Sequence, residues 1–410
     1  MLVPMDAHPF DRITVDELRR GGSLKWTGQQ EALGAWIAEM DFGTAPGVLE
    51  AAAQTIASGL VGYAPAYLVS SLQEATADWL DARFGWRLDP AQIRPLSNVG
   101  AAFDAAIMHF SPAHRPDAPV VLLTPAYMPF IDTPARFGRR SIQVPMLRTG
   151  IGWELDWAGL ESALSGGALL VLVNPHNPIG KVYTRAELLR ISRLVEHTGS
   201  RVFADEIHAP LVYGGYEHHP YAAISDTAAG HSITGISASK AFNIPGLKCA
   251  QLVLTNDADR TLWARVGIVP EHGAATPGLA GTAAAYDGGQ AWLGKVLGYL
   301  EGNRDLLGGL VAEHLPRVRY LAPQGTYLAW LDVSELGLGP DPVRFFRQQA
   351  QLALTDGALC GQAGRGFVRL NFATPRPVLA GMLHRMGASI DGPDQFDEDD
   401  PEYSGASPSF

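Results

Sequence analysis

Three polar side chains follow apolar stretches of the chain: Asn177 in VLVNPHNPIG, Asp205 in VFADEIHAPLVY and Lys240 in ITGISASK. Each apolar stretch is typical of a buried strand, so we expect each polar residue at a carboxyl strand end. An amine, a carboxylate and an amide are what a pyridoxal phosphate (PLP) site needs: a Schiff-base lysine, an acid facing the ring nitrogen and a partner for the ring hydroxyl. A lone lysine after a strand is usually a solvated surface residue, but the joint pattern disfavours that interpretation.

Helix and strand patterns alternate through the first two thirds of the chain. Continuous runs of Val, Leu and Ile in the strand candidates are typical of a parallel sheet that is covered on both faces. We therefore predict an α/β fold whose large domain, residues 46–285, is a doubly wound and mainly parallel sheet. The expected helices are 46–59, 71–85, 98–110, 157–166 and 184–199, and the expected strands are 118–127, 168–175 and 200–207.

The pattern changes after about residue 286. Shorter strand candidates (RVRYLAP, TYLAWLDV and GFVRLNFA) alternate with the helix candidates PVRFFRQQAQ and RPVLAGMLHRM, which predicts a smaller α+β C-terminal domain at 286–390. The N-terminal segment, residues 1–45, is expected to pack with this small domain. Ligands of open α/β sheets bind beyond the carboxyl ends of the strands, which is where the three polar residues fall.

Charge and composition exclude several classes of protein. The formal charge of −11 includes seven acids and no base in residues 391–410, which we expect to form an acidic, disordered tail that is either inert or binds a partner. No basic stripe indicates nucleic acid, no signal sequence is visible, and the longest apolar run, ALLVLV, is too short to span a membrane. Two cysteines without CxxC spacing suggest neither a disulfide framework nor zinc, so we expect a cytoplasmic protein that binds no metal.

Several motifs, in order, carry a resemblance to a known family. They are spread over nearly the whole chain except the tail. The motifs are the pair Lys25-Trp26, AWIAEMDF, TPAYMPF, NPHNPIG, DEIH, SASK and FVRLNFATPR. Together they resemble fold-type I PLP enzymes of the class I/II aminotransferase superfamily, and most of all the MalY/PatB-type cystathionine β-lyases. The resemblance implies pyridoxal 5'-phosphate as cofactor, held by Lys240 through a Schiff base.

The resemblance also assigns residues around the cofactor ring. Asp205 faces the pyridine nitrogen, and a close anion keeps that nitrogen protonated. Asn177 bonds the phenolate oxygen, and Tyr127 stacks on the ring and assists catalysis. His208 takes the place of an aminotransferase tyrosine; it either contacts the cofactor or is a satisfied buried histidine beside the site.

A second group of residues is expected to hold the phosphate. A helix N-terminus offers unpaired N–H groups and a favourable dipole, and hydroxyls and a cation add to it. The candidates are Val99, Gly100 and Ala101 at the start of an expected helix, and Ser237, Ser239 and Lys248 around the lysine. Ser237 could instead be a plain strand-end residue. Lys248 lies where the superfamily usually carries a cation, often arginine, and it keeps the charge without the bidentate fork.

Two further residues are implied at the edges of the site. Arg369, inside an apolar strand run, matches the arginine that clamps the substrate α-carboxylate. Tyr63 in GYAPAY matches a tyrosine that reaches the phosphate of a neighbouring subunit. The resemblance therefore implies a homodimer whose active sites are shared between subunits.

The expected activity is PLP-dependent carbon–sulfur β-lyase chemistry on cystathionine or another L-cysteine S-conjugate, yielding thiol, pyruvate and ammonia. Transamination, decarboxylative deamination in a biosynthetic pathway and a PLP-binding regulatory protein stay open as alternatives. The sequence departs from the lyases in three places: Glu39 replaces an aspartate, Cys360 replaces a common phenylalanine, and Asn98-Val99-Gly100 replaces a glycine and two valines.

Overall fold

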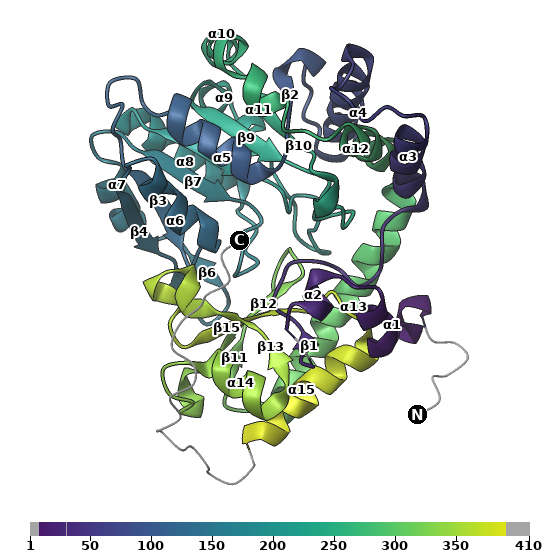
Figure 1. The fold of residues 1–410 in the computed structure, drawn as a ribbon. Helices are drawn as coiled ribbons and strands as arrows, with labels where there is room; N and C mark the ends of the chain where they lie inside the picture. The colour runs from purple at the N-terminus through teal and green to yellow at the C-terminus, as the bar shows by residue number, and fades with distance from the viewer. Residues whose placement is uncertain (1–7, 30, 391–410) are drawn as a thin grey trace.

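The computed structural model describes residues 8–29 and 31–390, so the expected acidic tail lies outside the described residues. Figure 1 shows a large sheet with its helices in one half of the molecule and a smaller sheet in the other. The long helix α13 (Gln290–His314) runs from the first half into the second, where it packs against α15 (Arg376–Ile390). The predicted α/β class is confirmed, while the domain limits at 45, 285 and 390 stay a prediction.

The large sheet has seven strands in the order β2-β10-β9-β8-β7-β3-β4. The pairs from β9 to β4 are parallel, and β10 runs antiparallel to both of its neighbours. The sheet is therefore mainly parallel, as the apolar runs predicted. Its strands are β2 (Ile93–Leu96), β3 (Val120–Thr124), β4 (Ser141–Pro145), β7 (Leu169–Val173), β8 (Arg201–Asp205), β9 (Ser232–Ile236) and β10 (Ala250–Leu254).

Both faces of this sheet are buried. Val121 and Leu170 belong to one apolar cluster, whereas their chain neighbours Leu122 and Val171 belong to another. Because side chains alternate across a strand, this division means that helices cover each face. The helices of this half are α3 (Pro46–Ala57), α4 (Ala66–Phe84), α5 (Val99–His109), α6 (Met128–Arg136), α7 (Trp157–Leu164), α8 (Arg185–Thr198), α9 (Asp226–His231), α10 (Asp257–Val266), α11 (Ile268–Glu271) and α12 (Thr276–Gly288).

The smaller sheet has four strands in the order β11-β12-β15-β14, and all of its pairs are antiparallel. Its strands are β11 (Arg319–Tyr320), β12 (Leu328–Asp332), β14 (Thr355–Asp356) and β15 (Phe367–Asn371), and α14 (Pro342–Ala350) and α15 pack nearby. A two-stranded hairpin, β5 (Leu147–Arg148) with β6 (Trp153–Glu154), follows β4.

The N-terminal segment lies against this smaller sheet. It contains α1 (Val15–Arg20), α2 (Leu24–Thr27) and β1 (Leu33–Gly34), and β1 pairs in parallel with β13 (Leu352–Ala353). Figure 1 shows the segment passing beside β12 and then rising to α3 in the large half. Residues 33–43 therefore connect the two halves near the carboxyl ends of the large sheet. Among the described residues, no helix is long and apolar enough to cross a membrane.

Candidate active site

Three adjacent strands of the large sheet end at the candidate site. Asp205 is the last residue of β8 and lies opposite Val173 of β7 and Gly235 of β9. The loop after β7 carries Asn177, and the turn after β9 carries Lys240. The structure thus brings the three strand-end residues to one edge of the sheet, as the sequence predicted.

Asp205 is buried, with 5% of its surface exposed. The pKa of Asp205 is raised to about 7, mainly by burial and in smaller part by the charge of the adjacent Glu206. The N–H of Ile207, which donates to its Oδ1 at 3.1 Å, and the charge of Lys240 act in the opposite direction. A cation placed next to this carboxylate would therefore stabilise its ionised form.

Lys240 donates from its Nζ to the carbonyl oxygen of Ala38 at 2.8 Å. Burial lowers its pKa to about 8, with the Arg369 charge acting in the same direction. The carboxylates of Glu39 and Asp205 raise it. The amine therefore loses its proton, and becomes nucleophilic, more readily than an exposed lysine does.

Arg369, on β15 of the small sheet, is 3% exposed. Its Nη1 donates to Asn177 Oδ1 at 3.2 Å, and its Nη2 donates to the carbonyl oxygen of Trp36 at 2.9 Å and to Thr355 Oγ1 at 3.1 Å. Its Nε is buried without a partner, and no carboxylate of the described residues forms an ion pair with it. Burial lowers its pKa, as expected for a cation that lacks a counterion.

His208 lies beneath the same site and is 2% exposed. Its ring meets Tyr327 edge-on at 6.0 Å, and its Nδ1 has no hydrogen-bond partner within residues 8–29 and 31–390. Burial, together with the Lys240 and Arg369 charges, lowers its pKa to about 3. The imidazole is therefore neutral and has one ring nitrogen available.

Tyr127 immediately precedes α6 and is 37% exposed, which makes it the most accessible of the aromatic candidates in this half of the site. Its ring packs edge-on against Phe130 at 5.4 Å. Burial raises its pKa, while the Arg369 charge lowers it and Asp205 raises it. Tyr127 thus lies close enough to Asp205 and Arg369 for both charges to act on its pKa.

The start of α5 offers fewer amides than the sequence suggested. Asn98 caps the helix, and its Oδ1 accepts the N–H of Ala101 at 2.9 Å. Val99 and Gly100 are the first two residues of the helix, where N–H groups have no intrahelical acceptor. These two amides, not that of Ala101, are the ones the helix presents to an anion.

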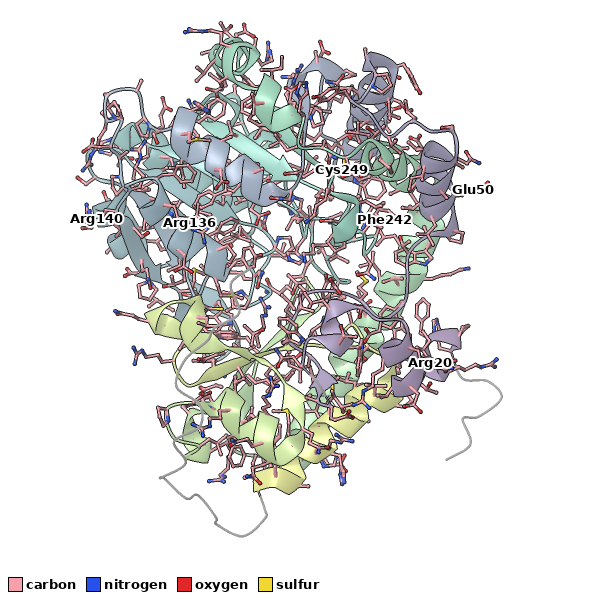
Figure 2. All side chains as sticks on the ribbon, viewed as in Figure 1. Arg20, Glu50, Arg136, Arg140, Phe242 and Cys249 are labelled. Atoms are coloured by element: carbon pink, nitrogen blue, oxygen red, sulfur yellow. The ribbon has the colours of Figure 1, made fainter. Side chains whose placement is uncertain are left out.

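The turn between Ser237 and Lys248 also contains a candidate phosphate ligand that is already hydrogen-bonded within the protein. Ser237 Oγ donates to the carbonyl oxygen of Cys249 at 2.9 Å and accepts the N–H of Ser239 at 3.1 Å. Lys248 is exposed and adopts a left-handed backbone conformation with φ of 51°. Figure 2 labels Phe242 and Cys249, which lie on either side of Lys248 in the chain and are both buried. Ser237 therefore shapes the turn, while the cation of Lys248 is exposed to solvent.

Tyr63 is placed apart from this constellation. It is 85% exposed, and its ring packs on His272 at 5.3 Å. The neighbouring carbonyl oxygen of Gly62 accepts the hydroxyl of Thr276, at the start of α12, at 2.8 Å. Within one chain, none of its described contacts is with Asp205, Asn177 or Lys240.

Sequence reasoning missed the backbone of residues 36–39, which supplies acceptors to Lys240 and Arg369. It also missed Thr355 and Tyr327, whose hydroxyls donate to the carbonyl oxygens of Trp36 and Ala38. Backbone carbonyls leave no signature in side-chain patterns, so only the AWIAEMDF motif could have indicated this segment.

The residues fit PLP as a cofactor. The site combines a deeply buried carboxylate whose pKa is raised, an amine whose pKa is lowered, and a neutral histidine with an unpartnered nitrogen. A cationic ring and an aldehyde would satisfy the carboxylate and the amine, and Asn177 is the candidate partner of the ring hydroxyl. The Val99 and Gly100 amides and Lys248 could hold the phosphate, and the unpartnered Nε of Arg369 remains for a substrate carboxylate.

Comparisons with known proteins agree with this chemistry. Residues 37–383 match the family described as aminotransferase class I and II. The chain is 33% identical to the cystathionine beta-lyase of Corynebacterium glutamicum over 383 residues, which covers 92% of this chain and 99% of the relative. It is 30% identical over 381 residues to cystathionine beta-lyase PatB of Bacillus subtilis, covering 90% and 96% of the two chains.

A solved structure from Corynebacterium diphtheriae, provisionally described as a PLP-dependent beta-cystathionase, superposes with a TM-score of 0.87 at 37% identity. The match covers 93% of this chain and 98% of that one. The likeness therefore extends over most of both chains.

Proposed function

Because this chain belongs to the aminotransferase class I and II family, we propose that it is a PLP-dependent carbon–sulfur β-lyase acting on cystathionine or another L-cysteine S-conjugate. The products are a thiol, pyruvate and ammonia. The observation that carries the proposal is the buried cation of Arg369, which has an unpartnered Nε beside the amine of Lys240. An amino-acid substrate would place its carboxylate on the Nε of Arg369 and its Cα near the amine of Lys240.

Arg369 binds the substrate α-carboxylate in this proposal. Its Nη1 and Nη2 are already held by Asn177, Trp36 and Thr355, so the guanidinium plane is fixed before substrate arrives. A preorganised fork of this kind gives up little side-chain entropy on binding. It also fixes the direction in which the Cα–H bond of the substrate points.

Lys240 and Asp205 divide the acid–base work. PLP, when bound, supplies an electron sink for the carbanion that forms at the substrate Cα. Lys240 removes the Cα proton, for which a pKa of about 8 suits an amine working near neutral pH. Asp205 keeps the ring nitrogen protonated, because a neighbouring cation favours its carboxylate form. Loss of the sulfur substituent from Cβ then separates elimination from transamination.

The relatives support elimination over transamination, since the two lyases cited match nearly the full length of this chain. The test is to incubate purified protein with a panel of cysteine S-conjugates and measure thiol, pyruvate and ammonia. A second assay follows transfer of the amino group to a keto acid. Thiol and pyruvate release without amino transfer supports the lyase; amino transfer alone overturns it.

The proposed active unit is a homodimer in which Tyr63 reaches the partner's phosphate site. Val61 (67% exposed) and Tyr67 (66%) lie near Tyr63 in the chain, and Ile268 (65%) and Val269 (76%) belong to α11, which directly precedes His272, the ring that Tyr63 contacts. Exposed apolar side chains on these two segments favour burial against another chain. Tyr63 has no described contact with the candidate site of its own chain. In a dimer, its phenol would instead lie at the phosphate site of the second copy.

We also infer a cytoplasmic location. Both cysteines, Cys249 and Cys360, are unpaired and buried, which is usual where thiols stay reduced. Fractionation of cells that produce the protein tests this assignment, with recovery in the periplasmic or secreted fraction as the contrary result.

A further inference from the structure

The backbone of the strap, which we define as residues 36–39, faces the proposed site with its carbonyl groups. The carbonyl oxygen of Trp36 accepts Arg369 Nη2 at 2.9 Å, and that of Ala38 accepts Lys240 Nζ at 2.8 Å. Tyr327 donates to the same Ala38 oxygen at 2.9 Å. The strap therefore contacts the candidate substrate clamp and the candidate base at once, one from each half of the molecule.

The other two strap carbonyls hold the strap to the small sheet. Asn371 Nδ2 donates to the carbonyl oxygens of Ile37 at 2.7 Å and of Glu39 at 2.6 Å. Asn371 is itself fully buried at the end of β15, two residues after Arg369. All four strap carbonyls thus accept hydrogen bonds from side chains of the small half, and those of Trp36 and Ala38 also accept from Arg369 and Lys240.

A buried ion pair, Lys25–Asp41, holds the C-terminal end of the strap. Lys25 on α2 has no exposed surface, and its Nζ donates to Asp41 Oδ2 at 2.8 Å, to the carbonyl oxygen of Glu39 at 3.3 Å and to that of Ala373 at 3.2 Å. Asp41 Oδ1 accepts Trp26 Nε1 at 2.8 Å. The ammonium and the carboxylate are both satisfied, so the pair fixes the C-terminal end of the strap.

The N-terminal end of the strap is fastened to the same helix. Trp36 Nε1 donates to the carbonyl oxygen of Lys25 at 3.2 Å. Gly34 approaches so closely that a Cβ there would lie 2.2 Å from that oxygen. Lys25 therefore binds one end of the strap through its backbone carbonyl and the other end through its side chain. Figure 1 shows α2 beside β1 and β12 at this point.

We propose that the Lys25–Asp41 ion pair is a positioning device that sets where the Trp36 and Ala38 carbonyls stand relative to Arg369 and Lys240. The inference rests on the proposed function, which gives those two residues their roles. Neither Lys25 nor Asp41 touches the reacting groups. A buried ion pair gives little net stability compared with apolar residues of similar size, so placement of the strap is the better account of its use here.

The test uses the double variant Lys25→Met/Asp41→Leu, which removes both charges and leaves none unpaired. Each single variant should lower the melting temperature, and the double variant should recover most of it. The matched control is Arg201→Met/Asp259→Leu, because that ion pair lies at the opposite end of β8, away from the strap.

Two readouts separate positioning from simple stability. One is kcat/KM on a cysteine S-conjugate, with kcat and KM both affected because Lys240 and Arg369 both lose an acceptor. The other needs no substrate: the rate at which the apoprotein takes up PLP through Lys240, followed by visible absorbance. The double variant should be slowed about ten- to hundredfold in both, as expected for small displacements of reacting groups. The control should stay within about twofold of wild type.

A double variant that folds and keeps the wild-type values in both readouts would overturn the proposal. If it does not fold, Asp41→Asn takes its place, since the amide keeps an oxygen for Trp26 but turns a donor towards Lys25. Unchanged kcat and uptake in Asp41→Asn would overturn the proposal equally. If the wild type releases no thiol but the double variant still takes up PLP slowly, the proposed function fails and the positioning role stands.

Discussion

Arg369 and Asn177 are joined by a hydrogen bond of 3.2 Å between Nη1 and Oδ1, although 192 residues separate them in the chain. Asn177 follows β7 of the large sheet, and Arg369 lies on β15 of the small one. The bond ties the proposed substrate clamp to a proposed cofactor ligand. A change in the relative placement of the two sheets would therefore alter both at the same time.

Arg369→Lys should weaken substrate binding although the charge is kept. Lysine lacks the planar fork, so it cannot hold Asn177, the Trp36 carbonyl and a carboxylate together. We expect KM to rise about thirty- to 150-fold, the effect of losing about 2–3 kcal/mol from a charged hydrogen bond. Steady-state kinetics measure it, with the exposed Arg365→Lys as control. An unchanged KM would place the carboxylate elsewhere.

Lys240→Ala should abolish covalent attachment of PLP. Borohydride treatment of the wild-type protein should fix the cofactor to Lys240, because burial lowers the pKa of this amine to about 8 and so favours its nucleophilic form. Peptide mass mapping after reduction checks the position. The exposed Lys295→Ala serves as control and should be labelled at Lys240 like the wild type. Label on any other lysine contradicts the assignment.

Asp205→Asn should change how the stability of the apoprotein depends on pH. Burial raises the pKa of Asp205 from 3.8 to about 7, so the folded protein binds this proton more tightly than the unfolded chain does. The stability that the folded protein gains by binding this proton is complete below about pH 4, and it is lost as the pH rises through about 7. Asparagine does not titrate, so over that range the variant should gain up to about 4 kcal/mol relative to wild type.

Urea unfolding of the two apoproteins at several pH values measures this difference in the free energy of unfolding. Comparing variant with wild type cancels the buried histidines His176 and His208, whose lowered pKa values act in the opposite direction. A difference that does not vary with pH would mean that the Asp205 carboxyl is not shielded from solvent.

Tyr63→Phe should reduce PLP retention by about 1.5–3 kcal/mol if its hydroxyl bonds the partner's phosphate. Mixed dimers with Lys240→Ala locate the effect. Placing both changes on one chain leaves each site with a single defect, whereas placing one on each chain leaves one site intact. The second arrangement should recover about half of wild-type activity. Equal activity in the two arrangements, or a fully active monomer, would refute a shared site.

Local sequence signals were enough to predict most of the large domain. Thr184 and Glu187 form a capping box and Gly199 closes the helix at a φ of 63°, so the helix predicted at 184–199 appears as α8. Strands without such signals were missed. The edge strand β4 is partly exposed, and β1 has only two residues, whose partners in β13 are distant in sequence.

The site was predictable as a set of residue types but not as a set of contacts. The strand-end positions of Asn177, Asp205 and Lys240 follow from the sheet topology. The sequence did not predict that Ala101 and Ser237 would be engaged by Asn98 and Cys249, because such partners depend on tertiary packing. The proposed role of each residue remains to be tested by the variants above.

The most direct measurement of the central claim is the product balance for one thioether, such as cystathionine, with wild-type and Lys240→Ala protein. Thiol, pyruvate and ammonia are quantified over time in the absence of any keto acid. The account predicts that wild type releases all three in equal amounts through many turnovers and that Lys240→Ala releases none. Amino transfer without thiol release, or undiminished release by Lys240→Ala, would contradict it.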